Sequence, residues 1–210
     1  MEWILQLPVL FFSVIFHEFA HGFAAYRRGD DTAYLSGRLS FNPLPHIDPV
    51  GTVLIPAACA FMNFPMIGWA KPVPVNPYRM RSPRRDMALV AFSGPLSNIL
   101  LAGLAVIAVR VLMLDFLPGD LTLTLLRMFG FAVLINLMLA VFNLIPLFPL
   151  DGSQIALGLL KGRALEIYEK HVPYGMYILL GLVFTGLLQK IMAPVLSLAL
   201  VLTASLMGAF

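Results

Sequence analysis

Long apolar runs alternate with short polar connectors along this chain. The first run covers residues 3–26 and ends at Arg27 and Arg28. Two further runs cover about residues 87–114 and 121–148, and a helix needs about 20 apolar residues to cross a bilayer. The pattern therefore predicts at least three transmembrane helices.

Two other apolar regions are compatible with more than one arrangement in the membrane. Residues 174–210, divided by Gln189-Lys190, fit either a helical hairpin or one long tilted helix. Residues 50–70 are interrupted by glycines and prolines, which suits a re-entrant or surface-lying segment as well as a span. Residues 71–85 are expected to be extended, because their alternating valines and prolines are typical of an edge strand or a polyproline-like strip. We therefore expect an all-α polytopic membrane protein, a bundle of about four to six transmembrane helices with a re-entrant or β-hairpin-like segment at 50–85.

The composition agrees with a membrane protein. Of the 210 residues, 60% are hydrophobic and 12% are charged, whereas a soluble domain has about 45–50% apolar and about 25% charged residues. No polar segment is long enough to fold by itself, so residues 1–210 are expected to form a single domain. The first run has no basic residue before it, which predicts a span rather than a cleaved signal peptide. Cys59 is the single cysteine, which excludes an internal disulfide.

The charges are unevenly distributed and predict a topology. The net charge of +3 is small, so we assign it to membrane orientation and not to nucleic-acid binding. Basic residues number three in the connector 27–49, five in the strip 71–85 and three in the connector 150–173, with none in the turn 115–120. If residues 50–70 enter the membrane without crossing it, the three basic regions share one face. The positive-inside rule then makes that face cytoplasmic.

The stretch H-E-F-A-H, residues 17–21, carries the strongest chemical signal. Residues four apart on a helix share a face, so His17 and His21 can bind one metal ion together. Imidazole nitrogens suit Zn²⁺, and Glu18 beside the first ligand can act as a general base. The alternative is that the histidines are polar residues packed between helices. Ionisable residues within a span are costly and usually functional, which favours the metal site.

Three further groups of polar residues are candidates for the site. Pro146 and Pro149 end the third run and place Asp151 on irregular backbone, which favours a third zinc ligand over a helix-end residue. His46 in the first connector fits an ordinary loop residue better than a ligand. For S-G-P-L-S-N, residues 93–98, tight helix packing with Ser or Asn bonding across helices is the preferred interpretation.

Three motifs together resemble one known family. H-E-F-A-H, S-G-P-L-S-N and N-L-I-P-L-F-P-L-D-G (residues 143–152) occur in the order found in site-2 proteases, which are intramembrane zinc metalloproteases. The resemblance covers about residues 3–160. It implies that one Zn²⁺ per chain is bound by His17, His21 and Asp151, with Glu18 as the catalytic acid/base.

The resemblance also implies how substrate is held. Asn143 matches an asparagine for which a role near the substrate carbonyl is expected. The strip that follows Trp69 resembles a membrane-associated β-hairpin that holds substrate in extended form, so Val73 and Val75 are expected on an exposed edge that binds substrate.

By this resemblance the chain is a zinc-dependent endopeptidase that cleaves peptide bonds in or near transmembrane segments. Its expected partners are transmembrane protein substrates and the lipid bilayer, with no nucleic acid. Its expected location is the plasma membrane of a bacterium, with the active site toward the cytoplasm. It is similar to the short, compact members without PDZ or nucleotide-sensing domains.

Two other functions remain as alternatives. A metal transporter also places histidines and carboxylates in the membrane, but it predicts several metal stations along the path. A non-catalytic membrane scaffold would bind partners through its apolar faces, but it has no need of Glu18. Zinc content measured together with cleavage of a transmembrane peptide separates the three.

Overall fold

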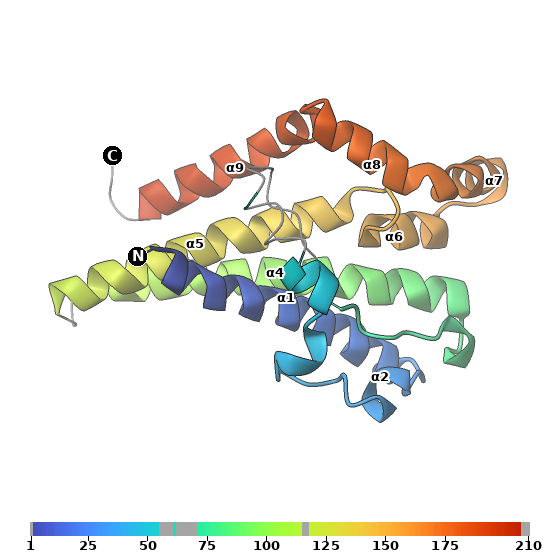
Figure 1. The fold of residues 1–210 in the computed structure, drawn as a ribbon, viewed down its shortest axis with the longest axis horizontal. Coiled ribbons are helices and arrows are strands. Elements are labelled where there is room, and N and C mark those ends of the chain that lie inside the picture. Colours follow the sequence, from blue (N-terminus) through green and yellow to red (C-terminus); the bar gives the residue numbers. More distant parts are fainter. Residues whose placement is uncertain (1, 55–60, 62–70, 115–117, 207–210) are drawn as a thin grey trace.

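The computed structural model describes residues 2–54, 61, 71–114 and 118–206, and the chain there is mainly helical (Figure 1). Within these described ranges, four helices are long and apolar enough to cross a membrane: α1 (Glu2–Arg27), α4 (Pro83–Leu112), α5 (Gly119–Leu144) and α9 (Leu187–Leu206). The shorter helices are α2 (Thr32–Leu35), α6 (Asp151–Leu159), α7 (Gly162–His171) and α8 (Gly175–Phe184). Short 3-10 or π turns lie at Leu44–His46, Pro49–Leu54, Pro77–Arg79 and Val172–Tyr174. The prediction of an all-α membrane bundle is confirmed.

Helix α4 lies at the centre of the bundle, in contact with α1, α5 and α6. Its buried face consists largely of small residues, which let neighbouring helix backbones approach closely, as is typical of packing within membranes. These residues are Ala88, Ala91, Gly94, Ala102 and Ala105. Helix α5 packs in turn against α9.

The basic regions lie at one end of this bundle. Helices α1 and α4 run antiparallel, so the end of α1 and the start of α4 are neighbours, and α6 and α7 lie at the same end (Figure 1). The start of α1 and the end of α9 lie at the opposite end. This is the arrangement expected if the connection between α1 and α4 does not cross the membrane. Most of the segment 50–70 lies outside the described residues.

The connector between α1 and α4 differs from the expected β-hairpin. Residues 71–76 are extended, but no strand is found in the described part of the connector. Side chains bind the backbone of this strip instead: Asp30 accepts a hydrogen bond from the Asn76 N–H at 2.6 Å, and Arg38 donates one to the Pro72 carbonyl at 3.0 Å. The alternation of valine and proline therefore produces an extended strip attached to the bundle and not a paired strand.

The C-terminal apolar region forms two helices, α8 and α9. The break falls at Gly186, whose φ of 70° lies in the left-handed region that favours glycine. Figure 1 shows that the chain continues from α8 into α9 with a bend and does not fold back as a tight hairpin. With 10 residues, α8 is too short to cross a bilayer by itself.

Candidate active site

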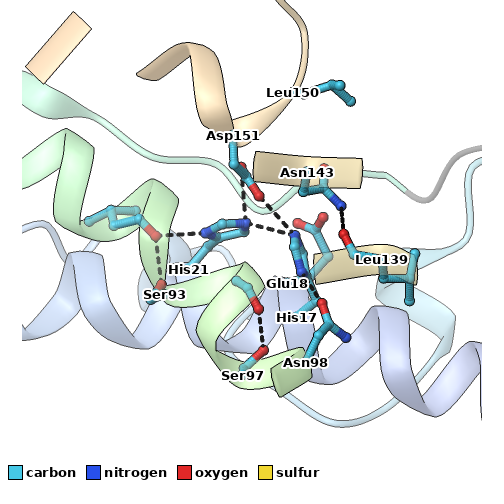
Figure 2. Close-up of polar contacts among 12 residues, drawn as sticks. His17, Glu18, His21, Ser93, Ser97, Asn98, Leu139, Asn143, Leu150 and Asp151 are labelled. Carbon is cyan, nitrogen blue, oxygen red and sulfur yellow. Dashed lines mark hydrogen bonds and ion pairs between the residues drawn. The ribbon is translucent and has the colours of Figure 1, made fainter. Parts of the chain in front are cut away.

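The two histidines of α1 and the aspartate that begins α6 lie together in the bundle (Figure 2). His17 Nε2 lies 3.0 Å from His21 Nε2. The Asp151 carboxylate approaches both rings, at 3.1 Å from His17 Nε2 and 3.3 Å from His21 Nε2. The residues predicted as the three zinc ligands are therefore neighbours in space. They form the one cluster of three or more potential metal ligands in the part of the chain that the structure describes.

The hydrogen bonds at the far side of each ring determine which nitrogen carries a proton. His17 Nδ1 lies 2.6 Å from Asn98 Oδ1, and His21 Nδ1 lies 2.8 Å from the Val90 carbonyl oxygen. Because both partners accept hydrogen bonds, both Nδ1 atoms must donate. In the neutral rings, each Nε2 then presents a lone pair to the centre of the cluster.

These lone pairs make the cluster fit a metal ion. Two Nε2 atoms and a carboxylate converge without a donor between them, and Asp151 Oδ2 is buried with no hydrogen-bond partner among the described residues. Three electron-pair donors at such short distances repel one another unless a cation lies between them. Two imidazoles and one carboxylate are a known ligand set of catalytic zinc.

The backbone around Asp151 depends on proline and glycine. Helix α5 ends at Leu144, shortly before Pro146, as the sequence predicts. The turn that follows brings α6 so close that a Cβ at Gly152 would lie 2.4 Å from the carbonyl oxygen of Ile145. Glycine is therefore required beside the ligand for steric reasons.

Glu18 lies beside His17 on α1 but does not belong to the ligand cluster. It is half-buried, and its Oε2 accepts a hydrogen bond from the Val73 N–H at 2.8 Å. In Figure 2 its side chain lies beside the ring of His17. A carboxylate fixed next to a metal site, with one oxygen held by the backbone, is suited to accept and deliver a proton.

Behind His17 lies a buried polar network, in which Asn98 bonds across helices as the packing interpretation of residues 93–98 predicts, with partners that the sequence did not identify. Asn98 Nδ2 donates to Asn136 Oδ1 at 2.8 Å, and Asn136 Nδ2 donates to Ser13 Oγ at 2.9 Å. All three side chains are at most 2% exposed. Asn98 therefore does more than pack between helices, because its oxygen faces His17. The available signal was an asparagine in the middle of each of two apolar runs, Asn98 and Asn136.

The remaining site predictions have mixed outcomes. The Val73 side chain is buried, with Cγ1 at 3.0 Å from where a Cβ of Gly22 would lie, and Val75 packs against the core, so the role of this edge toward substrate stays a prediction. Asn143 is half-buried and donates to the Leu139 carbonyl, so its role toward substrate stays a prediction. His46 is buried in the connector, where its Nε2 lies 3.0 Å from the Ser40 carbonyl oxygen, and it is not part of the ligand cluster.

Comparisons with known proteins point to one family. The profile of Peptidase family M50 matches residues 113–186. The "Putative zinc metalloprotease YwhC" of Bacillus subtilis (strain 168) is 36% identical over 191 residues, which cover 90% of this chain and 84% of YwhC. The "Putative zinc metalloprotease Rip2" of Mycobacterium tuberculosis (strain ATCC 25618 / H37Rv) is 33% identical over 141 residues. These cover 67% of this chain and 51% of Rip2. No solved structure matches the chain.

Gly94 on α4 provides a test of the crowding around the ligands. A Cβ at this position would lie 2.5 Å from His21 Nε2 and 2.6 Å from His17 Cε1. We therefore expect Gly94→Ala to weaken zinc binding by about tenfold or more, measured by competition with a chelator. Gly103→Ala is the matched control on the same helix, because nothing lies within 4 Å of its added methyl. Equal zinc affinity in the two variants would contradict this geometry.

Asn98 provides a test of the hydrogen bond that orients His17. Asn98→Ala removes the acceptor of the Nδ1 proton, so the zinc affinity should fall by about 10–100-fold. Asn98→Asp keeps an oxygen at this position and should restore much of that affinity. Zinc titration of the detergent-purified variants measures both effects, and circular dichroism checks that the helices persist. An alanine variant with wild-type zinc affinity would show that Asn98 only packs.

Proposed function

This chain belongs to peptidase family M50, and from that membership we propose that His17, His21 and Asp151 bind its catalytic zinc ion, with Glu18 as acid/base. The chain is an intramembrane zinc metalloprotease. The observation that carries the assignment of residues is the convergence of two Nε2 lone pairs on the buried Asp151 carboxylate. Glu18 is the adjacent carboxylate that stays outside this ligand set.

The chemistry follows from the positions of these groups. A bound zinc ion supplies a Lewis acid that activates water and polarises the scissile carbonyl. Glu18 takes up the proton of the attacking water on its carboxylate and then delivers it to the leaving amine. The Val73 N–H holds Glu18 Oε2, which keeps the carboxylate in one orientation during both transfers. Asn98 and the Val90 carbonyl keep both imidazoles in the tautomer that exposes Nε2.

We assign transmembrane segments of other proteins as the substrate class. A peptide bond within a helix has its carbonyl engaged in a backbone hydrogen bond, so the substrate must unwind before attack. Residues 71–76 are extended, and their backbone lies against Glu18. We place the unwound substrate along this strip. Because Val73 and Val75 face inward, the contact is expected through backbone groups.

We place the active site toward the cytoplasm of a bacterial cell. Of the 14 basic residues, 11 belong to the three connectors at the end of the bundle where α1 finishes and α4 begins. The positive-inside rule assigns that end to the cytoplasm. The relatives named above are bacterial, which supports the plasma membrane of a bacterium as the location.

Replacing Glu18 separates catalysis from metal binding. Glu18→Gln should lower the cleavage rate of a single-pass transmembrane substrate by about 100-fold or more, because the proton transfers are lost. The zinc content should remain one per chain. His17→Ala, the matched control on the neighbouring residue, should lose both zinc and cleavage. Substantial cleavage by the Glu18→Gln protein would rule out its role as acid/base.

Single cysteines test the orientation in intact bacterial cells. In a Cys59→Ser background, Ser36→Cys and Glu166→Cys place thiols on exposed sites at the basic end, and Asp120→Cys places one at the opposite end. We expect an impermeant maleimide to label only Asp120→Cys in intact cells, and all three after lysis. Labelling of both basic-end cysteines from outside would reverse the assigned orientation. Labelling of only one of them would require an additional membrane crossing between α1 and α4.

A further inference from the structure

A basic pocket lies where α1 ends and α4 begins. It has a volume of about 300 Å³, and its lining includes Arg27, Arg28, Arg81 and Arg85. One carboxylate, Asp86, lines the same pocket. Four guanidinium groups against one carboxylate leave three positive charges in excess, which indicates a site for an anion.

Asp86 does not neutralise the pocket, but it holds Arg28 and the Ser82 backbone in place at one side of it. Asp86 Oδ1 accepts from Arg28 Nη1 at 2.7 Å, and Oδ2 accepts from the Ser82 N–H at 2.8 Å. Both carboxylate oxygens are thus engaged, and the Arg28 guanidinium is held in one orientation. Among the described residues, Arg28 is the only one of the four arginines with an ion pair. The others are left to bind an external anion, and the N-terminus of α4 adds a favourable dipole.

An apolar groove continues from this pocket along the bundle. It has a volume of about 510 Å³, shares Arg27 and Arg28 with the pocket, and runs between α1 and α4. Phe23, Leu89, Phe92 and Leu96 line it, and each is 38–48% exposed. A charged pocket that opens into an apolar groove fits a ligand with an anionic head and a hydrocarbon tail.

The pocket and the groove together correspond in length to one membrane leaflet. From Arg85 in the pocket to Leu96 in the groove, α4 rises about 16 Å at about 1.5 Å per residue. Half of a hydrocarbon core of about 30 Å is about 15 Å. The arginines therefore lie at the level of the lipid headgroups, and the groove follows the acyl region.

We propose that this pocket and groove form a binding site for an anionic phospholipid, with its phosphate among Arg27, Arg81 and Arg85 and an acyl chain between α1 and α4. The planar guanidinium group matches the phosphate oxygens in two-pronged geometry. Basic pockets between transmembrane helices select anionic headgroups in this way. The proposal concerns binding and does not depend on which residues catalyse proteolysis.

Native mass spectrometry of the full chain in a non-ionic detergent tests this site. The probes are phosphatidylglycerol and phosphatidylcholine with the same acyl chains. We expect the wild type to retain phosphatidylglycerol in preference to phosphatidylcholine. The double variant Arg27→Gln/Arg81→Gln should weaken phosphatidylglycerol binding about 25-fold, at about fivefold for each arginine near the surface.

The matched control removes the same charge elsewhere at the basic end. Arg163→Gln/Lys170→Gln lies on α7, away from the pocket, and should retain wild-type phosphatidylglycerol binding. Unchanged zinc content and helix content in both variants show that folding is intact. Soluble glycerol phosphate, which has the headgroup charge without acyl chains, should not displace the lipid at equal concentration.

Three results would overturn the proposal. Equal retention of the two lipids by the wild type would remove the headgroup selectivity. Equal weakening by the two double variants would indicate a general charge effect with no site. Displacement by glycerol phosphate at equal concentration would indicate an anion pocket in which the apolar groove takes no part.

Discussion

The convergence of unprotonated ligand atoms is the constraint on which this structure depends. His17 and His21 each use Nδ1 as a donor, so when both rings are neutral their Nε2 lone pairs meet the Asp151 carboxylate. The repulsion among these atoms destabilises a bundle that carries few charges. A bound cation would replace this repulsion with attraction, and its binding free energy would then stabilise the assembled bundle. Because the ligands come from α1 and α6 and their partners from α4, the same cation ties three helices together.

The central helix α4 meets two demands of this site at once. Gly94 leaves the space in which both imidazole rings lie, and Asn98, one turn later, provides the acceptor for His17. Asn136 on α5 and Ser13 on α1 then satisfy the amide of Asn98. An amide buried in an apolar bundle needs such partners, since each unmet hydrogen bond costs about 1–3 kcal/mol. The orientation of a metal ligand is thus connected to the packing of three membrane helices.

The sequence predicted what depends on local geometry and not what depends on register between distant segments. His17 and His21 follow from helical periodicity, and Asp151 follows from the prolines that end α5. The pairing of Asn98 with Asn136 depends on how α4 and α5 slide against each other, which neither helix encodes alone. The alternating valines and prolines predicted extended backbone over residues 71–85, which is wrong for the 3-10 turn at Pro77–Arg79 and for the start of α4 at Pro83. Their alternation did not show that Val73 faces inward, because a period of two does not say which face is covered.

The depth of the site constrains where a substrate can be cut. His21 precedes the end of α1 at Arg27 by six residues and His17 by ten, which correspond to about 9 and 15 Å of helix. The ligands therefore lie between the basic surface and about the middle of a hydrocarbon core of about 30 Å. The extended strip that reaches Glu18 comes from the same basic end. We therefore expect water and an unwound peptide to approach from the basic end. The cleaved bond should then lie in the half of its transmembrane segment nearer the basic surface, because that half reaches Glu18 without crossing the bilayer midplane.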